Sequence, residues 1–274
     1  RTATNRTRPV QTGEHKIMNQ SDPVGHSKRL VEPKVATGDF QSFAATLEHA
    51  SPLETLTWAV ESYGNGLTFA TGFGPEGCVL IDLIGRHDLP VDIFTLDTGL
   101  LFPETQTLWR QLEDKYSLTI RAVRPLQSVD EQKAEHGDKL WERTPDQCCK
   151  LRKVIPLRAE LSKGDAWITA IRRDQTAERA NALVVEWDKK FQMAKVNPLV
   201  RWTKQHVWDH LNQFDVPYNK LHDDGYPSIG CMPCTTAVAV GEDDRSGRWR
   251  GTAKTECGLH GSAIATPQSM HEGS

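Results

Sequence analysis

The sequence predicts an α/β fold in which a parallel sheet is flanked by helices. Two observations support this prediction. After residue 66, short apolar segments alternate with amphipathic segments, and this alternation is typical of strands and crossover helices in a parallel sheet. Glycines and charged residues directly follow several of the apolar segments, and ligands of such folds bind at the carboxyl ends of the strands.

Two helices are predicted before the first strand. Apolar residues recur at three- and four-residue spacings at Phe40, Phe43 and Leu47, which indicates an amphipathic helix. The segment Ser51-Pro52-Leu53-Glu54 combines an N-cap serine, a proline at the first helical position and a glutamate at the third. This combination predicts a second helix that runs toward Tyr63.

The remaining elements follow from the same periodicities. Short apolar segments predict strands at 67–71, 91–96, 118–123 and 166–171. Amphipathic segments predict helices at 76–86, 103–116, 148–161 and 203–214. Beyond residue 217 the sequence becomes rich in Gly, Pro, Asp and Arg, so no further element is predicted there.

The charge and hydropathy of the chain argue against nucleic-acid and membrane binding. The first 38 residues carry a net charge of +4, which leaves −7 on the rest of the chain. Non-specific nucleic-acid binding depends on neutralised phosphates, so we expect any bound anion to meet a local basic pocket. No apolar run exceeds four residues, whereas a membrane-spanning helix needs about 20. We therefore expect a soluble chain.

The loop after the first predicted strand has the composition of an anion site. The segment Thr71-Gly72-Phe73-Gly74-Pro75-Glu76-Gly77 lies between a predicted strand and a predicted helix, where main-chain N–H groups and the helix dipole bind phosphates. A glycine-rich turn at this place can also have a purely steric origin. Asp97 ends the next strand and either faces a ribose or base or caps the turn.

Basic side chains gather in two further places. Arg172 and Arg173 directly follow the fourth predicted strand, and guanidinium groups bind phosphate and sulfate oxygens in pairs. Arg245 and Arg248 belong to a basic segment near the C-terminus that also contains Arg250 and Lys254. The alternative is that these basic side chains are solvated and that their charge balances the charge of neighbouring acidic residues.

Four of the six cysteines form two close pairs. Cys148 and Cys149 are adjacent, and Cys231 and Cys234 are separated by two residues. Four thiolates can hold zinc or an iron–sulfur cluster, and an adjacent pair is unusual for structural zinc, so we favour the cluster. Disulfide exchange by Cys231 and Cys234 is a third interpretation. No export segment is recognised, so we expect a cytoplasmic protein with reduced thiols.

Three other residues complete the candidate set. Lys153 lies four positions after Cys149, so a helix would place its ammonium group on the same face as that cysteine. Cys257 follows a basic segment without a packing period, and an accessible cysteine near positive charge is a candidate nucleophile. Cys78 lies in an apolar helix and is interpreted as a core residue.

Together these motifs resemble the assimilatory adenylyl-sulfate reductases, the iron–sulfur branch of a family that also contains phosphoadenylyl-sulfate reductases. The resemblance covers about residues 40–261 and rests on the two cysteine pairs, on Leu96-Asp97-Thr98-Gly99, on Ile171-Arg172-Arg173-Asp174-Gln175 and on Glu256-Cys257-Gly258-Leu259-His260. The last motif is the most specific. The family commonly has Ser-Phe-Gly where this chain has Gly72-Phe73-Gly74. The serine hydroxyl is absent here, so the resemblance implies phosphate binding by the main chain of this loop.

The resemblance implies an adenine-nucleotide α-hydrolase-like fold with a modified pyrophosphatase loop at Thr71 to Gly77. It implies one 4Fe-4S cluster on the four paired cysteines, with Lys153 between the cluster and the substrate and with Arg245 and Arg248 on the phosphosulfate group. Cys257 is the implied nucleophile. It attacks adenylyl sulfate, releases AMP and becomes an S-sulfocysteine, from which a separate thioredoxin releases sulfite for sulfate assimilation and cysteine biosynthesis.

Three regions are then expected: a mobile N-terminal tail at 1–38, a nucleotide- and cluster-binding α/β domain at 39–234, and a flexible C-terminal arm at 235–274 that carries the nucleophilic cysteine. The nearest alternative is a reductase for phosphoadenylyl sulfate or for both nucleotides. Another is a zinc-stabilised nucleotide-binding or sulfur-transfer protein. A regulator that senses through its cluster would need a basic recognition helix, which the acidic body lacks.

Overall fold

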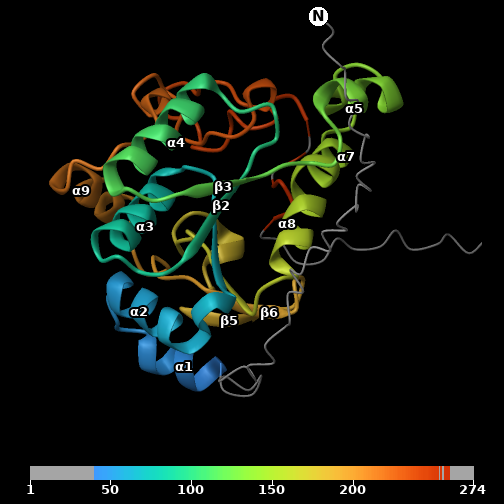
Figure 1. Cartoon of the computed structure of the whole chain (residues 1–274). Helices are drawn as coiled ribbons and strands as arrows, with labels where there is room; N and C mark the ends of the chain where they lie inside the picture. Colours follow the sequence, from blue (N-terminus) through green and yellow to red (C-terminus); the bar gives the residue numbers. More distant parts are fainter. Residues whose placement is uncertain (1–39, 253, 255, 260–274) are drawn as a thin grey trace, which may run out of the picture. The chain divides into compact units, whose positions relative to one another are not determined.

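The computed structural model consists of strands flanked by helices (Figure 1). Within the residues that the structure describes, 40–252, 254 and 256–259, six strands form one sheet in the order β3-β2-β1-β4-β6-β5. They are β1 (Leu67–Thr71), β2 (Asp92–Leu96), β3 (Ile120–Val123), β4 (Ala166–Ile168), β5 (Val185–Asp188) and β6 (Met193–Val196). All neighbours are parallel except β5 and β6. The predicted α/β fold is thus confirmed, whereas the tail at 1–38 lies outside the described residues.

Helices precede, connect and follow these strands along the chain. They are α1 (Phe40–Leu47), α2 (Pro52–Tyr63), α3 (Pro75–Arg86), α4 (Pro103–Tyr116), α5 (Val129–His136), α6 (Leu140–Arg143), α7 (Pro145–Cys149), α8 (Ile155–Leu161) and α9 (Lys204–Gln213). A π-helical turn, η2 (Lys150–Val154), joins α7 to α8. Short 3-10 turns are η1 (Gly64–Gly66), η3 (Ala177–Arg179), η4 (Lys220–His222) and η5 (Met232–Cys234). No helix in the described part of the chain is long and apolar enough to cross a bilayer.

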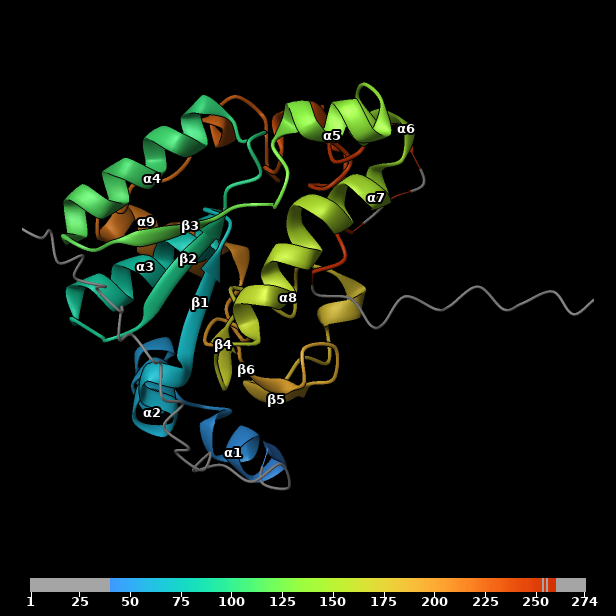
Figure 2. The ribbon, with the colours of Figure 1, turned by 45° about the vertical axis from the view of Figure 1, so that its right-hand side comes forward.

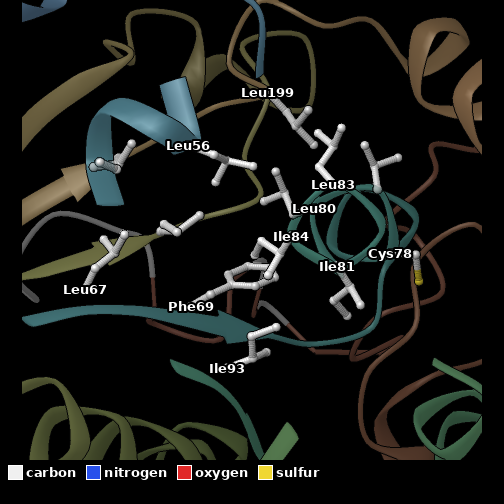
Figure 3. Packing of buried hydrophobic residues seen from close by; sticks show 14 of the residues in the cluster. Leu56, Leu67, Phe69, Cys78, Leu80, Ile81, Leu83, Ile84, Ile93 and Leu199 are labelled. Atoms are coloured by element: carbon white, nitrogen blue, oxygen red, sulfur yellow. The ribbon is translucent and has the colours of Figure 1, made fainter. Parts of the chain in front are cut away.

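The two faces of the sheet bury different side chains, because successive residues of a strand point to opposite faces. In β2, Ile93 belongs to a first core cluster with residues of α2, α3, α4 and α9, part of which Figure 3 shows around Phe69 and Leu80. The next residue, Phe94, belongs to a second core cluster with Leu157 of α8. Helices therefore cover both faces, and Figure 2 shows α8 beside β4.

The N-terminal helices form where the sequence predicts them. Ser51 caps α2, since its side chain accepts a hydrogen bond from the Glu54 N–H at 3.2 Å and the Glu54 carboxylate accepts one from the Ser51 N–H at 2.7 Å. In α1, Phe40 packs against Trp187 of β5 with ring centroids 5.7 Å apart. The capping box and the apolar spacing therefore correctly located both helices.

Other boundaries differ from the prediction. The strand expected at 118–123 begins at Ile120, and the strand expected at 166–171 ends at Ile168. The helix expected at 148–161 is divided into α7, η2 and α8. The antiparallel pair of β5 and β6 and the polar helix α5 were not predicted.

One buried carboxylate fastens α3 to its neighbours. Asp82 has no exposed surface and accepts hydrogen bonds from Arg86, from the Tyr116 hydroxyl of α4 at 2.8 Å and from His210 of α9 at 2.7 Å. Burial alone would raise the pKa of Asp82, but these hydrogen bonds outweigh burial and lower the pKa to about 2. Asp82 therefore stabilises the fold in its charged form.

We expect Asp82→Asn to lower the free energy of unfolding by about 3 kcal/mol at pH 7, the scale for breaking a buried charge pair. An unfolded aspartate has a pKa of about 3.9, so the stabilisation is present above about pH 4 and is lost as pH falls toward 2. Urea unfolding at pH 7 and at lower pH measures both effects. Asp88→Asn, at an exposed position, is the control, and equal stability of the two variants at pH 7 would contradict the assigned role.

Candidate functional site

A cavity of about 200 Å³ lies at the carboxyl ends of β1 and β2. The loop after β1 contributes Gly72 and Phe73 to its wall, and the end of β2 contributes Thr95 and Leu96. Three chemically active side chains from distant parts of the sequence complete the wall: Lys153, Arg248 and Cys257. A larger cavity of about 520 Å³ near the start of α2 and α9 contains none of the predicted site residues, so the site is assigned to the smaller one.

The loop after β1 has a constrained backbone. Phe73 is buried and has a φ of 58°, a conformation that costs a non-glycine residue about 1–3 kcal/mol and is frequent at functional sites. The Thr71 hydroxyl accepts a hydrogen bond from the Phe73 N–H at 3.1 Å, and the Phe73 ring packs against Trp109 at 5.7 Å. Because α3 begins directly after this loop, its positive end meets the same region. The loop therefore fits an anion.

The four paired cysteines lie around a second cavity. Cys148, Cys149, Cys231 and Cys234 line it together with Arg152 and Lys153. Burial and the neighbouring thiolates Cys149 and Cys231 raise the pKa of Cys148 to about 11, and burial and Cys231 raise that of Cys234 to about 12. The structure therefore brings the two cysteine pairs together around one cavity.

A layer of hydrogen bonds positions this cysteine cavity. Arg152 donates to the Thr98 carbonyl at 2.6 Å and to the Gln132 side chain at 3.1 Å. Gln132, from α5, is 3.9 Å from the Cys148 sulfur, and the Thr98 hydroxyl is 3.3 Å from the Cys231 sulfur. Three separate segments are thus tied to the two cysteine pairs.

Lys153 lines both cavities. Its position in the π-helical turn η2 places it between the cysteines and the loop after β1, and such turns often occur at functional sites. Burial alone would lower the pKa of Lys153, but the thiolates of Cys231 and Cys257 outweigh burial and raise it. Lys153 therefore presents a positive charge to both cavities.

Cys257 is surrounded by cations from several elements. Lys153 and Arg248 share its cavity. The adjacent Glu256 carboxylate lies 3.6 Å from Arg179 and 3.2 Å from Arg245. Burial lowers the pKa of Arg248 and the Cys257 thiolate opposes this effect, but a guanidinium keeps its charge in proteins. The surroundings of Cys257 therefore suit an anionic ligand.

Glycines allow the close packing of this region. A Cβ at Gly230 would collide with the guanidinium of Arg248, so the absence of a side chain there leaves room for the cation. Gly258 has a φ of 76°, which glycine adopts without strain. His260, the last residue of the cysteine motif, lies outside the described residues.

Five of the predicted substrate-binding residues do not line the cavity: Gly74, Asp97, Arg172, Arg173 and Arg245. The Asp97 carboxylate accepts hydrogen bonds from the Gly99 N–H and from Arg124 at 2.9 Å, which corresponds to the alternative of a turn cap. Arg172 binds Glu76 at 2.9 Å and also pairs with Asp174. Neither side chain lines the cavity.

Arg173 is also directed away from the cavity. It binds both carboxylate oxygens of Glu48, at 2.6 and 3.0 Å, and the carbonyl of Ala182 at 2.8 Å. The structure instead brings Arg179 and Lys190 toward Cys257, since Arg179 lies 3.6 Å from the carboxylate of the preceding Glu256 and Lys190 donates a hydrogen bond to the carbonyl of the following Gly258. Sequence reasoning missed these two residues because both stand in polar segments without a motif.

Comparisons with known proteins find one matching family model and several similar proteins. A model of the phosphoadenosine phosphosulfate reductase domain matches residues 66–237. Adenosine 5′-phosphosulfate reductase 1 of Bacillus subtilis is 50% identical over 209 residues, which are 76% of this chain and 90% of the relative. The corresponding protein of Oceanobacillus iheyensis is 49% identical over 75% of this chain and 86% of its own length.

A solved structure is also similar. The phosphoadenylyl-sulfate reductase of Candida auris, crystallised as a phosphate complex, superposes with a TM-score of 0.66 at 33% identity. The match covers 74% of this chain and 98% of the Candida auris chain.

Proposed function

Because the chain belongs to the phosphoadenosine phosphosulfate reductase domain family, we propose that it reduces adenylyl sulfate to sulfite and AMP through Cys257. The protein is an oxidoreductase that acts on sulfur, and relatives with 45–50% identity are named adenosine 5′-phosphosulfate reductase. The observation that supports the assignment to Cys257 is its place in one cavity with Lys153, Arg248 and the loop after β1.

The first step transfers a sulfonate group. The Cys257 thiolate attacks the sulfur of adenylyl sulfate, an S–S bond forms, and the bond between sulfur and the bridging oxygen breaks with its electron pair left on AMP. Thiolate and substrate are both anions, and two unit charges about 4 Å apart repel by about 4 kcal/mol at an effective dielectric constant of 20. Lys153 and Arg248 line the cavity and supply positive charge that offsets this repulsion. Arg245 and Arg179, which share the one Glu256 carboxylate, add a smaller net positive charge.

The second step releases sulfite. A thioredoxin thiolate attacks the Cys257 sulfur of the S-sulfocysteine, so that the S–S bond breaks toward sulfite and a mixed disulfide forms. The second thiol of thioredoxin resolves this disulfide, which restores Cys257 and leaves thioredoxin oxidised. The two electrons come from the dithiol. A segment that can withdraw from the cavity would expose the adduct to this partner. This requirement supports a division of the chain into a nucleotide- and cluster-binding domain at 39–234 and a flexible arm at 235–274.

The cysteine cavity fits a 4Fe-4S cluster. Its donors are four thiolates, the ligands of such clusters, and Arg152 and Lys153 lie beside them. An adjacent cysteine pair such as Cys148 and Cys149 is unusual for a structural zinc site, which favours a cluster over a single zinc. When bound, the cluster supplies a fixed negative charge that orients Lys153. Thiol chemistry and thiolate ligands need a reducing compartment, which supports a cytoplasmic location.

The nucleotide preference is the second part of the proposal. Adenylyl sulfate is favoured by the names of the bacterial relatives, whereas the Candida auris protein is named for phosphoadenylyl sulfate. Parallel kinetics with the two nucleotides test this preference. A higher kcat/KM for phosphoadenylyl sulfate would overturn it.

Mass spectrometry tests the central chemistry. The purified protein is incubated with adenylyl sulfate while reductant is omitted, and its intact mass and peptides are measured. We expect one sulfonate increment on the peptide that contains Cys257, lost as sulfite when reduced thioredoxin is added. Absence of the increment from that peptide would refute the proposed function.

A further inference from the structure

The segment that carries Cys257 touches the turn between β5 and β6. The Lys190 ammonium group donates a hydrogen bond to the carbonyl oxygen of Gly258, the residue directly after the nucleophile. Leu259 packs against the second core cluster, as does Phe191 of the same turn. One hydrogen bond thus connects the turn with the residue that follows Cys257, and both segments pack against the same core cluster.

The turn is rigid enough to serve as a support. The Asp188 carboxylate accepts hydrogen bonds from the N–H groups of Lys190 and Phe191, at 2.9 and 3.1 Å. The Phe191 ring meets Trp167 of β4 edge to face, with centroids 5.4 Å apart, and Trp167 is fully buried. The backbone that presents Lys190 is therefore fixed both by its own carboxylate cap and by the core of the sheet.

Lys190 has no role in the cysteine cavity and does not line the cavity of Cys257. Its side chain is partly buried, and burial lowers its pKa while Asp188 and Cys257 oppose this effect. A hydrogen bond from a charged donor contributes more than one between neutral groups. The Lys190 hydrogen bond is accepted by the main chain of the residue next to Cys257. It therefore influences the position of the nucleophile.

We propose that Lys190 is a positioning residue, which holds the Cys257 segment in its closed place by binding the Gly258 carbonyl and thereby promotes sulfonate transfer to Cys257. The inference rests on the proposed function and adds a separate contact to it, the docking point, at which Lys190 holds the Gly258 carbonyl. Closure is needed in the first step, when the thiolate must reach the substrate. It opposes the second step, in which another protein must reach the adduct. Loss of Lys190 should therefore affect the two steps differently.

Two single-turnover measurements separate these effects. Formation of the Cys257 adduct is followed by intact mass after adenylyl sulfate is added without reductant, and its loss is followed after reduced thioredoxin is added. We expect Lys190→Met to slow formation about 10-fold, the scale of one charged hydrogen bond, and to leave the loss equally fast or faster. Lys190→Arg, which keeps a charged donor, should recover part of the formation rate.

Lys189→Met is the matched control, because it removes the same charge from the exposed neighbouring position and should leave both rates unchanged. The proposal is overturned if Lys190→Met forms the adduct as fast as this control, or if both steps slow equally. A third readout needs no nucleotide: iodoacetamide should alkylate Cys257 faster in Lys190→Met than in Lys189→Met. If the wild-type protein forms no adduct, the proposed function fails, whereas this alkylation comparison still tests the docking point.

Discussion

Cys257→Ser is expected to lower the rate of sulfite formation by about 10⁴-fold or more, the scale for loss of a catalytic nucleophile. A serine hydroxyl is far less acidic than a thiol and gives too little of the anion to attack sulfur. If it did react, its sulfate ester would contain no S–S bond that thioredoxin could reduce. The variant should still bind AMP, because the loop after β1 and Arg248 are unchanged.

Sulfite release and the intact-mass increment measure the effect of this substitution. Cys78→Ala is the matched control, because Cys78 is another cysteine outside the paired set, is fully buried in α3 and has a pKa that burial raises. We expect near wild-type turnover and a normal adduct from the control. Turnover of Cys257→Ser at the control rate would remove Cys257 from the chemistry.

Cys149→Ser is expected to lose its iron and, as a consequence, about 100-fold in sulfite formation. The buried Cys149 lies at the end of α7 and lines the cysteine cavity with Lys153, which also lines the cavity of Cys257. Without the full ligand set the position of Lys153 is no longer fixed, and small displacements of a catalytic cation cost about 100-fold.

Iron analysis and visible absorption of anaerobically purified protein measure this loss, and Cys78→Ala should retain the wild-type iron content. A full complement of iron in Cys149→Ser would show that Cys149 is not a ligand. Colourless wild-type protein that contains zinc and no iron would instead support the zinc alternative.

The sequence located elements whose boundaries depend on local chemistry. The capping box at Ser51 and the proline at Pro103 set the starts of α2 and α4 as expected, because such interactions involve residues within one helical turn. The hairpin of β5 and β6 was missed. Its turn depends on the Asp188 carboxylate and on a φ of 56° at Gln192, and no Gly or Asn marks it.

In the candidate site, too, the residues recognised from local sequence differ from those that depend on tertiary contacts. The cysteine pairs and Cys257 could be identified from residue type and spacing, since few side chains perform thiol chemistry. Arginines were harder to assign. Arg173 is bound by Glu48, which directly follows α1 and lies 125 positions away in the sequence. Arg179 lies near Glu256. Only the tertiary fold decides which carboxylate neutralises a given guanidinium.

The cavity joins parts of the chain that are synthesised at very different times. Gly72, in the anion loop, and Cys257 are 185 positions apart, and chains grow from the N-terminus while completed domains fold. A nascent polypeptide that stops before Cys257 contains the loop after β1 but lacks part of the cavity wall. The cavity is therefore completed only after translation has passed residue 257.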